Sequence, residues 1–191
     1  RIKKKIKNNY LISTINDENM SFLYSFSKLL KIRDKKFIIA MQTFRGLSHR
    51  FEVFLKKKNI TFIDDSKATS FTASQLALSS LKNIYWILGG LPKKGDRLDL
   101  NNYKNNIIKC YIIGKNTNFF KNQISGKLPF SITKNLKNSL IQISKDINRK
   151  DLTNKTILLS PSAASFDQFT NFEMRGVKFK ELCKTYVKNF I

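Results

Sequence analysis

The sequence predicts an α/β fold: a Rossmann-like, mostly parallel sheet with flanking helices, preceded by a helical segment. Three short apolar runs carry this prediction, at residues 84–90, 107–114 and 156–161. Each run ends in Gly or Pro, and helical stretches separate the runs, as expected for strands that alternate with crossover helices. In open sheets of this kind ligands bind beyond the carboxyl ends of the strands, so the segments that follow the runs are the candidates for a site.

Two helices are expected before the sheet. Within residues 16–32 the apolar side chains recur along one helical face, at Phe22, Leu23, Phe26, Leu29 and Leu30. A second helical pattern covers residues 37–44 and ends before Gly46, a residue that can close a helix. We therefore place a domain boundary near Gly46, with residues 1–45 ending one domain and residues 46–191 forming the next.

The periodicity changes after Gly46. Residues 50–55 and 60–64 alternate between apolar and polar side chains, and they flank the polar stretch 56–59. This pattern predicts a hairpin that leads directly into the first polar segment of the sheet.

Composition describes a globular chain with a large positive charge. The 191 residues are 41% hydrophobic and carry a formal net charge of +23. The excess is mostly Lys, spread along the chain with abundant Asn and Ile, which indicates a compositional bias and not a patch built for nucleic acid. No apolar run approaches the roughly 20 residues that span a bilayer. We expect neither a nucleic-acid nor a membrane partner.

The start of the chain and its cysteines give two further expectations. The sequence begins at Arg1 without an initiator Met, and its first residues lack the apolar core of a signal peptide, so we expect further chain upstream. Cys110 lies inside an apolar run and Cys183 on an expected terminal helix, without metal-type spacing. Both are interpreted as core thiols in a reducing cytoplasm.

Two polar clusters lie before and after the expected hairpin. Residues 44–52 include the single histidine of the chain, His49, and Arg50, whose guanidinium can bind a phosphate through two hydrogen bonds. A lone His is more often structural than catalytic. The second cluster, DDSKATS at residues 64–70, presents a carboxylate, an ammonium and hydroxyls at a strand end. Asp65 or Ser66 could instead cap the following helix.

Two more clusters follow the later strands. Gly89 and Gly90 allow a tight turn that sets Lys93 over the strand edge, but no GxxxxGK[ST] phosphate loop occurs in the chain. Residues 158–176 place small hydroxyl residues between a strand and a long helix, whose first backbone amides favour an anionic group. A small-residue turn required for packing is the alternative.

Together these clusters resemble the D-glutamate-adding branch of the Mur ligase family. The resemblance lies in GLSHRFE, DDSKATS, the glycine pair followed by Lys93, and LLSPSAASFDQFTNFEMRG, and it covers residues 16–186. Ser48 and Ala163 stand where the family usually has Pro and Cys. Ile15 replaces the His of a family His-Asn pair, which puts only the nucleotide-base contacts in doubt.

The resemblance implies an ATP-dependent ligase of peptidoglycan synthesis, and so a role in cell-wall biogenesis, cell division and cell shape. Its substrates would be UDP-N-acetylmuramoyl-L-alanine, D-glutamate and ATP. Residues 1–45 would end the central ATPase domain and residues 46–191 would form the carboxy-terminal domain. Mg²⁺ would be held mostly by the rest of the enzyme, with no metal ligand in this chain. We expect a cytoplasmic monomer, and a fragment that is inactive alone.

The family also implies roles for individual residues. Lys67 would be the catalytic group that stabilises charge on the transferred phosphoryl group. D-glutamate would be bound by Thr69, Lys93, Ser165 and the backbone amide of Phe172. ATP would be bound by Asn16, Asn19, His49, Arg50 and Asp65.

Three alternatives remain. A folylpolyglutamate synthetase or another Mur ligase would share the architecture with a different residue set after the last strand. A basic RNA-binding module would instead show aromatic residues interleaved with Lys on an exposed sheet.

Overall fold

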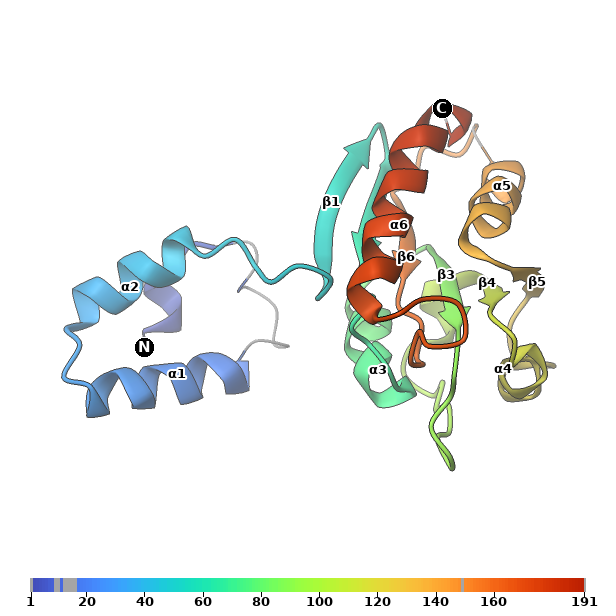
Figure 1. Ribbon diagram of the computed structural model, residues 1–191. Coiled ribbons are helices and arrows are strands. Elements are labelled where there is room, and N and C mark those ends of the chain that lie inside the picture. Colours follow the sequence, from blue (N-terminus) through green and yellow to red (C-terminus); the bar gives the residue numbers. More distant parts are fainter. Residues whose placement is uncertain (1, 9–10, 12–16, 149, 191) are drawn as a thin grey trace. The chain divides into compact units, whose positions relative to one another are not determined.

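The computed structural model describes residues 2–8, 11, 17–148 and 150–190. The chain forms two compact units, Arg1–Leu47 and Ser48–Ile191 (Figure 1).

The first unit is helical. It contains a short 3-10 helix, η1 (Lys3–Lys5), and two α-helices, α1 (Asp17–Leu29) and α2 (Asp34–Thr43). Four buried side chains form its core: Ile6, Leu11, Met20 and Phe37. The apolar face predicted for α1 is not part of that core, because Phe22 is 72% exposed and Leu29 is 78% exposed.

The second unit is built on a six-stranded sheet in the order β1-β2-β6-β3-β4-β5. The strands are β1 (Glu52–Lys57), β2 (Ile60–Asp64), β3 (Ile84–Gly89), β4 (Ile107–Ile113), β5 (Phe130–Lys134) and β6 (Lys155–Leu159). β1 and β2 form the predicted antiparallel hairpin, and every other neighbouring pair is parallel. The predicted fold class is therefore confirmed.

One strand escaped the sequence analysis. β5 is an edge strand of five residues, and its one buried side chain is Thr133. It lacks the buried apolar run that marks the inner strands, because its other side chains are only partly buried or exposed. Its pairing with β4 extends the parallel sheet nonetheless.

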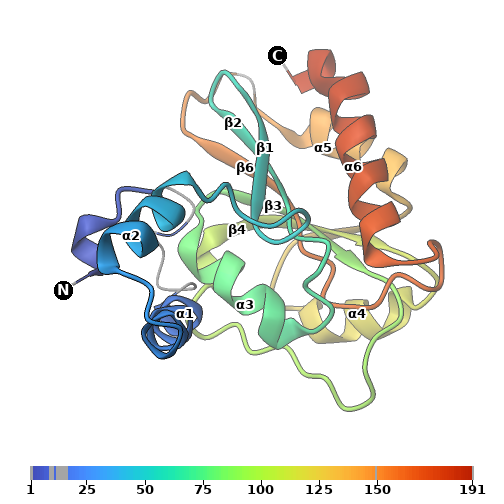
Figure 2. The same cartoon turned by 60° about the vertical axis from the view of Figure 1, so that its left-hand side comes forward.

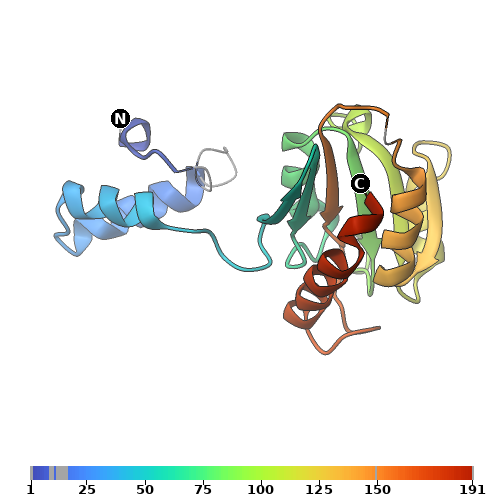
Figure 3. The same ribbon diagram turned by 90° about the horizontal axis from the view of Figure 1, so that it is seen from above.

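Helices cover both faces of the sheet, as Figures 2 and 3 show. α3 (Phe71–Ser80) and α4 (Thr117–Ile124) share one core with Trp86 of β3, whereas α5 (Leu136–Asp146) and α6 (Phe172–Tyr186) share the other with Tyr85 and its neighbours. Two 3-10 helices, η3 (Lys104–Asn106) and η4 (Val187–Phe190), complete the unit. Successive side chains of a strand enter opposite cores, which explains the continuous apolar runs.

Two smaller expectations can be compared with the structure. Cys110 and Cys183 are both buried and unpaired, as expected for core thiols. Among the described helices none has the length and apolar character needed to cross a membrane.

The central position of β6 generates a stability prediction. Leu158 is fully buried on this strand, so Leu158→Ala should lower the free energy of unfolding by about 2–5 kcal/mol through lost burial and a cavity. Denaturant titration followed by the fluorescence of buried Trp86 measures it. Leu152→Ala is the matched control, because Leu152 is 85% exposed and should change stability by less than about 0.5 kcal/mol. Equal midpoints for the two variants would contradict the assignment of Leu158 to the core.

Candidate functional site

Three polar loops lie side by side because β6 sits between β2 and β3 and runs parallel to both. Their carboxyl ends therefore share one edge of the sheet. Hydrogen bonds join the loop after β6 to each neighbour. The Asp65 amide donates to the Leu159 carbonyl at 2.8 Å, and Leu91 and Ala164 exchange backbone bonds at 2.8 and 3.0 Å. The loops thus form one connected floor.

Asp65 directly follows β2 and is almost fully buried. One carboxylate oxygen accepts the Phe51 amide at 3.0 Å, and the other accepts the Ser160 hydroxyl at 2.8 Å. Burial raises the pKa of Asp65 to about 7, and these two hydrogen bonds oppose the increase. The alternative that Asp65 or Ser66 caps the next helix is wrong, because the side chain of Ser70 caps α3.

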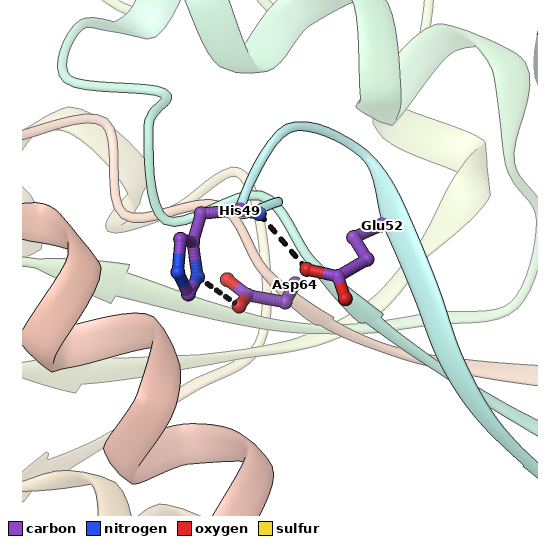
Figure 4. A group of neighbouring side chains, drawn as sticks. All are labelled: His49, Glu52 and Asp64. Carbon is purple, nitrogen blue, oxygen red and sulfur yellow. Dashed lines mark hydrogen bonds and ion pairs between the residues drawn. The ribbon is translucent and has the colours of Figure 1, made fainter. Parts of the chain in front are cut away.

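His49 is a buried residue that connects the hairpin to the loop after β2. Its Nδ1 lies 2.7 Å from Oδ2 of Asp64, and its amide donates to Glu52 at 2.9 Å (Figure 4). Its carbonyl accepts the Lys67 amide at 3.0 Å. The backbone of His49 is left-handed, with φ of 62°. These bonds fix the position of Arg50, the exposed next residue, relative to Asp65.

The glycine of the last motif has a steric explanation. α6 passes so close to His49 that a Cβ on Gly176 would lie 2.1 Å from His49 Nδ1 and 2.6 Å from Asp64 Oδ2. Such distances are far below van der Waals contact. Glycine is therefore the residue that lets α6 pack against this buried pair.

His49, Glu52 and Asp64 are also the one group among the described residues with ligand atoms close enough for a metal ion, all within 4.8 Å. The ammonium of Lys180 lies 2.9 Å from Glu52 and 3.8 Å from Asp64. That ammonium already supplies the positive charge, and Mg²⁺ prefers oxygen ligands alone. The group does not fit Mg²⁺, and we assign no metal to it.

Arg175 is a site residue that the sequence analysis missed. Its guanidinium is buried, donating to the Ser66 hydroxyl at 3.0 Å, to the Ser66 carbonyl at 2.8 Å and to the Ala163 carbonyl at 3.0 Å. Burial lowers its pKa to about 10, so it stays charged at neutral pH. It bridges the loops after β2 and β6. The local sequence gives no clear signal, because Arg175 lies among other charged residues such as Glu173 and Lys178.

The side chains of Lys67 and Phe172 lie close together. Lys67 is exposed, and its ammonium lies 5.2 Å from the centre of the Phe172 ring. Phe172 begins α6, and its carbonyl accepts the Ser66 hydroxyl at 2.8 Å. The loop after β2 and the start of α6 are thus joined directly.

Thr69 and Lys93 lie on two segments that are bonded to each other. The amide of Phe71, two residues after Thr69, donates to Asp96 at 2.9 Å, and the Asp96 amide bonds the Lys93 carbonyl at 3.2 Å. Thr69 is half-buried and Lys93 is exposed. Their side chains therefore rise from neighbouring turns.

The remaining predicted residues occupy different surroundings. Ser165 is buried in the loop after β6. Asn19 is exposed on α1, in the first unit, and Asn16 lies outside the described residues. The structure therefore places eight of the ten candidates within the second unit: His49, Arg50, Asp65, Lys67, Thr69, Lys93, Ser165 and Phe172.

Comparison with known proteins identifies relatives of this chain. Two curated relatives, from Rickettsia conorii and a Wolbachia of Brugia malayi, are named UDP-N-acetylmuramoylalanine--D-glutamate ligase. They are 36% and 39% identical over 88% and 92% of the chain. This chain is a homologue of the Mur ligases. It spans about a third of those relatives, 34% in each case, and no family model matches it.

Solved Mur ligases share the fold. The UDP-N-acetylmuramate-alanine ligase MurC of Thermotoga maritima aligns with a TM-score of 0.57 and 14% identity, covering 91% of this chain and 38% of that one. The MurF ligase of the same organism, in complex with ADP, aligns with a TM-score of 0.52 and 16% identity, covering 78% and 34%. These likenesses support the mostly parallel sheet with flanking helices as the fold of a Mur ligase.

The close approach of α6 to His49 makes a testable prediction. Gly176→Ala should improve helix propensity by about 1 kcal/mol, yet the clash should destabilise the chain by about 1–3 kcal/mol. Denaturant titration measures the balance. In a double-mutant cycle, His49→Ala should relieve part of the cost, since it removes the ring that meets the new methyl group and leaves the contact with Asp64 Oδ2 in place. Additive effects of the two substitutions would rule out the proposed contact.

Proposed function

We propose that this chain is the carboxy-terminal part of the ATP-dependent ligase that adds D-glutamate to UDP-N-acetylmuramoyl-L-alanine in cytoplasmic peptidoglycan synthesis. Residues 1–45 would end its ATPase domain and residues 46–191 would form its last domain. The observation that carries the proposal is the connected floor after β2, β6 and β3, from which one acid and two lysines of the predicted set arise. The homology supports the same reaction.

The proposed reaction has two steps. The γ-phosphoryl group of ATP passes to a carboxylate oxygen of UDP-N-acetylmuramoyl-L-alanine, which gives ADP and an acyl phosphate. The amine of D-glutamate then attacks the acyl carbon, an amide bond forms, and inorganic phosphate leaves as the amine loses a proton. Catalysis of this kind is mostly positioning and charge stabilisation.

On the nucleotide side, the groups match the parts of ATP that they would bind. The buried Asp65 carboxylate would accept the ribose hydroxyls, and exposed Arg50 would bind the phosphates. Lys67, which is exposed and has its ammonium over the Phe172 ring, would stabilise the charge of the transferred group. Asn16 and Asn19 would contact adenine. His49, being buried, would act through the position of Arg50.

On the amino-acid side, D-glutamate brings two carboxylates. The Lys93 ammonium, the hydroxyls of Thr69 and Ser165 and the amide of Phe172 are donors of the type that carboxylates require. Mg²⁺ would accompany ATP through ligands in the rest of the enzyme, and the group formed by His49, Glu52 and Asp64 already contacts the Lys180 ammonium.

Neither a related ligase, such as a folylpolyglutamate synthetase, nor a basic RNA-binding module gains support from a specific observation. The aromatic side chains of the sheet, such as Phe62, Trp86 and Tyr111, are buried between helices and not displayed for base stacking.

Replacing Lys93 or Lys67 should change different kinetic constants of the full-length ligase. Lys93→Ala should raise KM for D-glutamate about 10- to 100-fold, because a carboxylate loses a charged partner worth about 1.5–3 kcal/mol. Lys67→Ala should lower kcat instead, since it acts on charge that develops in the transition state. Steady-state kinetics measures both. Lys94→Ala, an exposed neighbour, is the control. Normal kinetics in the Lys67→Ala Lys93→Ala double variant would sink both assignments.

The isolated chain gives a separate test of function. Because it contains no phosphate loop, it should show no ATP-dependent ligation, whereas the full-length enzyme should add D-glutamate. Product formation measured by chromatography checks this. Tight RNA binding by the isolated chain at physiological salt, with no ligation by the full-length protein, would favour the basic surface as the functional feature.

A further inference from the structure

Three fully buried serines form a chain of hydroxyls that the proposed function does not use. Ser160 Oγ lies 2.8 Å from Oδ2 of Asp65 and 2.8 Å from Ser74 Oγ, and Ser74 Oγ lies 2.7 Å from Ser162 Oγ. Ser74 comes from α3, and the other two come from the loop after β6. The chain therefore runs from Asp65 into the loop that carries Ser165.

Each hydroxyl has one proton to donate, so the chain has a direction. An ionised Asp65 can only accept, which requires Ser160 to donate to it. Ser160 can then accept from Ser74, whose hydroxyl also lies 3.3 Å from the Ser160 carbonyl, and Ser74 can accept from Ser162. In this order all three protons point toward the carboxylate. A neutral Asp65 lets this order reverse. Aligned hydroxyl dipoles strengthen one another and favour the charged acid.

The other surroundings of Asp65 shift its pKa in both directions. Burial and the neighbouring Asp64 raise its pKa, whereas Arg50, the Phe51 amide and the Ser160 hydroxyl lower it. The serine chain is the contribution from α3 and from the loop after β6. Removing it would leave the carboxylate buried with the Phe51 amide as its remaining hydrogen-bond donor among the described residues.

We propose that Ser74, Ser160 and Ser162 are positioning residues that orient the Asp65 carboxylate and favour its ionised form for hydroxyl groups of the nucleotide ribose. They also connect this carboxylate to the loop that carries Ser165. One buried chain of hydroxyls therefore links the proposed nucleotide side of the site to its proposed D-glutamate side. The identity of the ligand rests on the proposed function. The hydroxyl chain and its effect on Asp65 do not.

The first experiment needs no enzymatic activity. In the 191-residue chain, the carboxyl carbon of Asp65 is titrated by NMR. Its midpoint, about 7 in the parent chain, should rise by about one pH unit in Ser74→Ala and in Ser160→Ala. Ser79→Ala is the matched control on α3, because Ser79 is exposed and bonds the Leu76 carbonyl of its own helix. An unchanged midpoint in both buried variants overturns the inference.

Folding of each variant is checked by its amide spectrum. If Ser74→Ala loses the folded spectrum, Ser160→Ala decides, because it removes the hydroxyl that contacts Asp65 itself.

The second experiment uses the full-length ligase. KM for ATP should rise as pH falls through the Asp65 midpoint, because the neutral acid loses its charge and an acceptor. In Ser74→Ala this rise should begin at higher pH, giving about a 3- to 10-fold higher KM near pH 7 with kcat little changed at saturation. A purely structural role would not move the pH profile, and an unmoved profile overturns the inference. A wild-type enzyme without ligase activity would overturn the proposed function, and the NMR titration would still decide the serine chain.

Discussion

The parallel pairing of β6 with both β2 and β3 is the constraint on which the candidate site depends. β6 is the last strand in the sequence but lies at the centre of the sheet, and all five of its residues are buried. Because its two neighbours run in the same direction, three loops that are far apart in sequence emerge at one edge. Leu159, Ala164 and Ser160 then bond directly to the adjacent loops. A slip of one residue in this pairing would turn the side chains of β6 to the opposite faces.

The floor of the site is a buried polar network, and such networks are stable only when their members are paired. The His49–Asp64 pair meets this requirement, and Arg175 meets it through Nε and Nη2, by bonds that join the hairpin, two loops and α6. The Nη1 atom of Arg175 is buried without a hydrogen-bond partner among the described residues. Lys67 and Lys93, in contrast, are exposed. The site thus combines a buried, hydrogen-bonded base with two long exposed side chains, one of which, Lys67, lies over the Phe172 ring.

The sequence predicted the elements whose signal is local. The inner strands appear as apolar runs because both of their faces are buried, and the hairpin appears as alternation. β5 was missed because an edge strand with Thr133 as its buried residue has no such run. The structural role of Arg175 could not be predicted, since its partner Ser66 is 109 residues away. The helical pattern of α1 was predicted, but its apolar side chains Phe22 and Leu29 are exposed and join no core among the described residues.

The distribution of charge at the site also explains why a net charge of +23 does not require a polyanionic partner such as RNA. The acids, Asp64 and Asp65, are buried in the floor, whereas Arg50, Lys67 and Lys93 are exposed around it. The buried Asp65 carboxylate suits a ligand with hydroxyl donors. The exposed cations suit the phosphates and carboxylates of a ligand. A nucleotide and an acidic amino acid together present these groups. Long nucleic acid would need a continuous cationic track instead. The local arrangement of charge, more than the total charge, therefore supports the proposed ligase function.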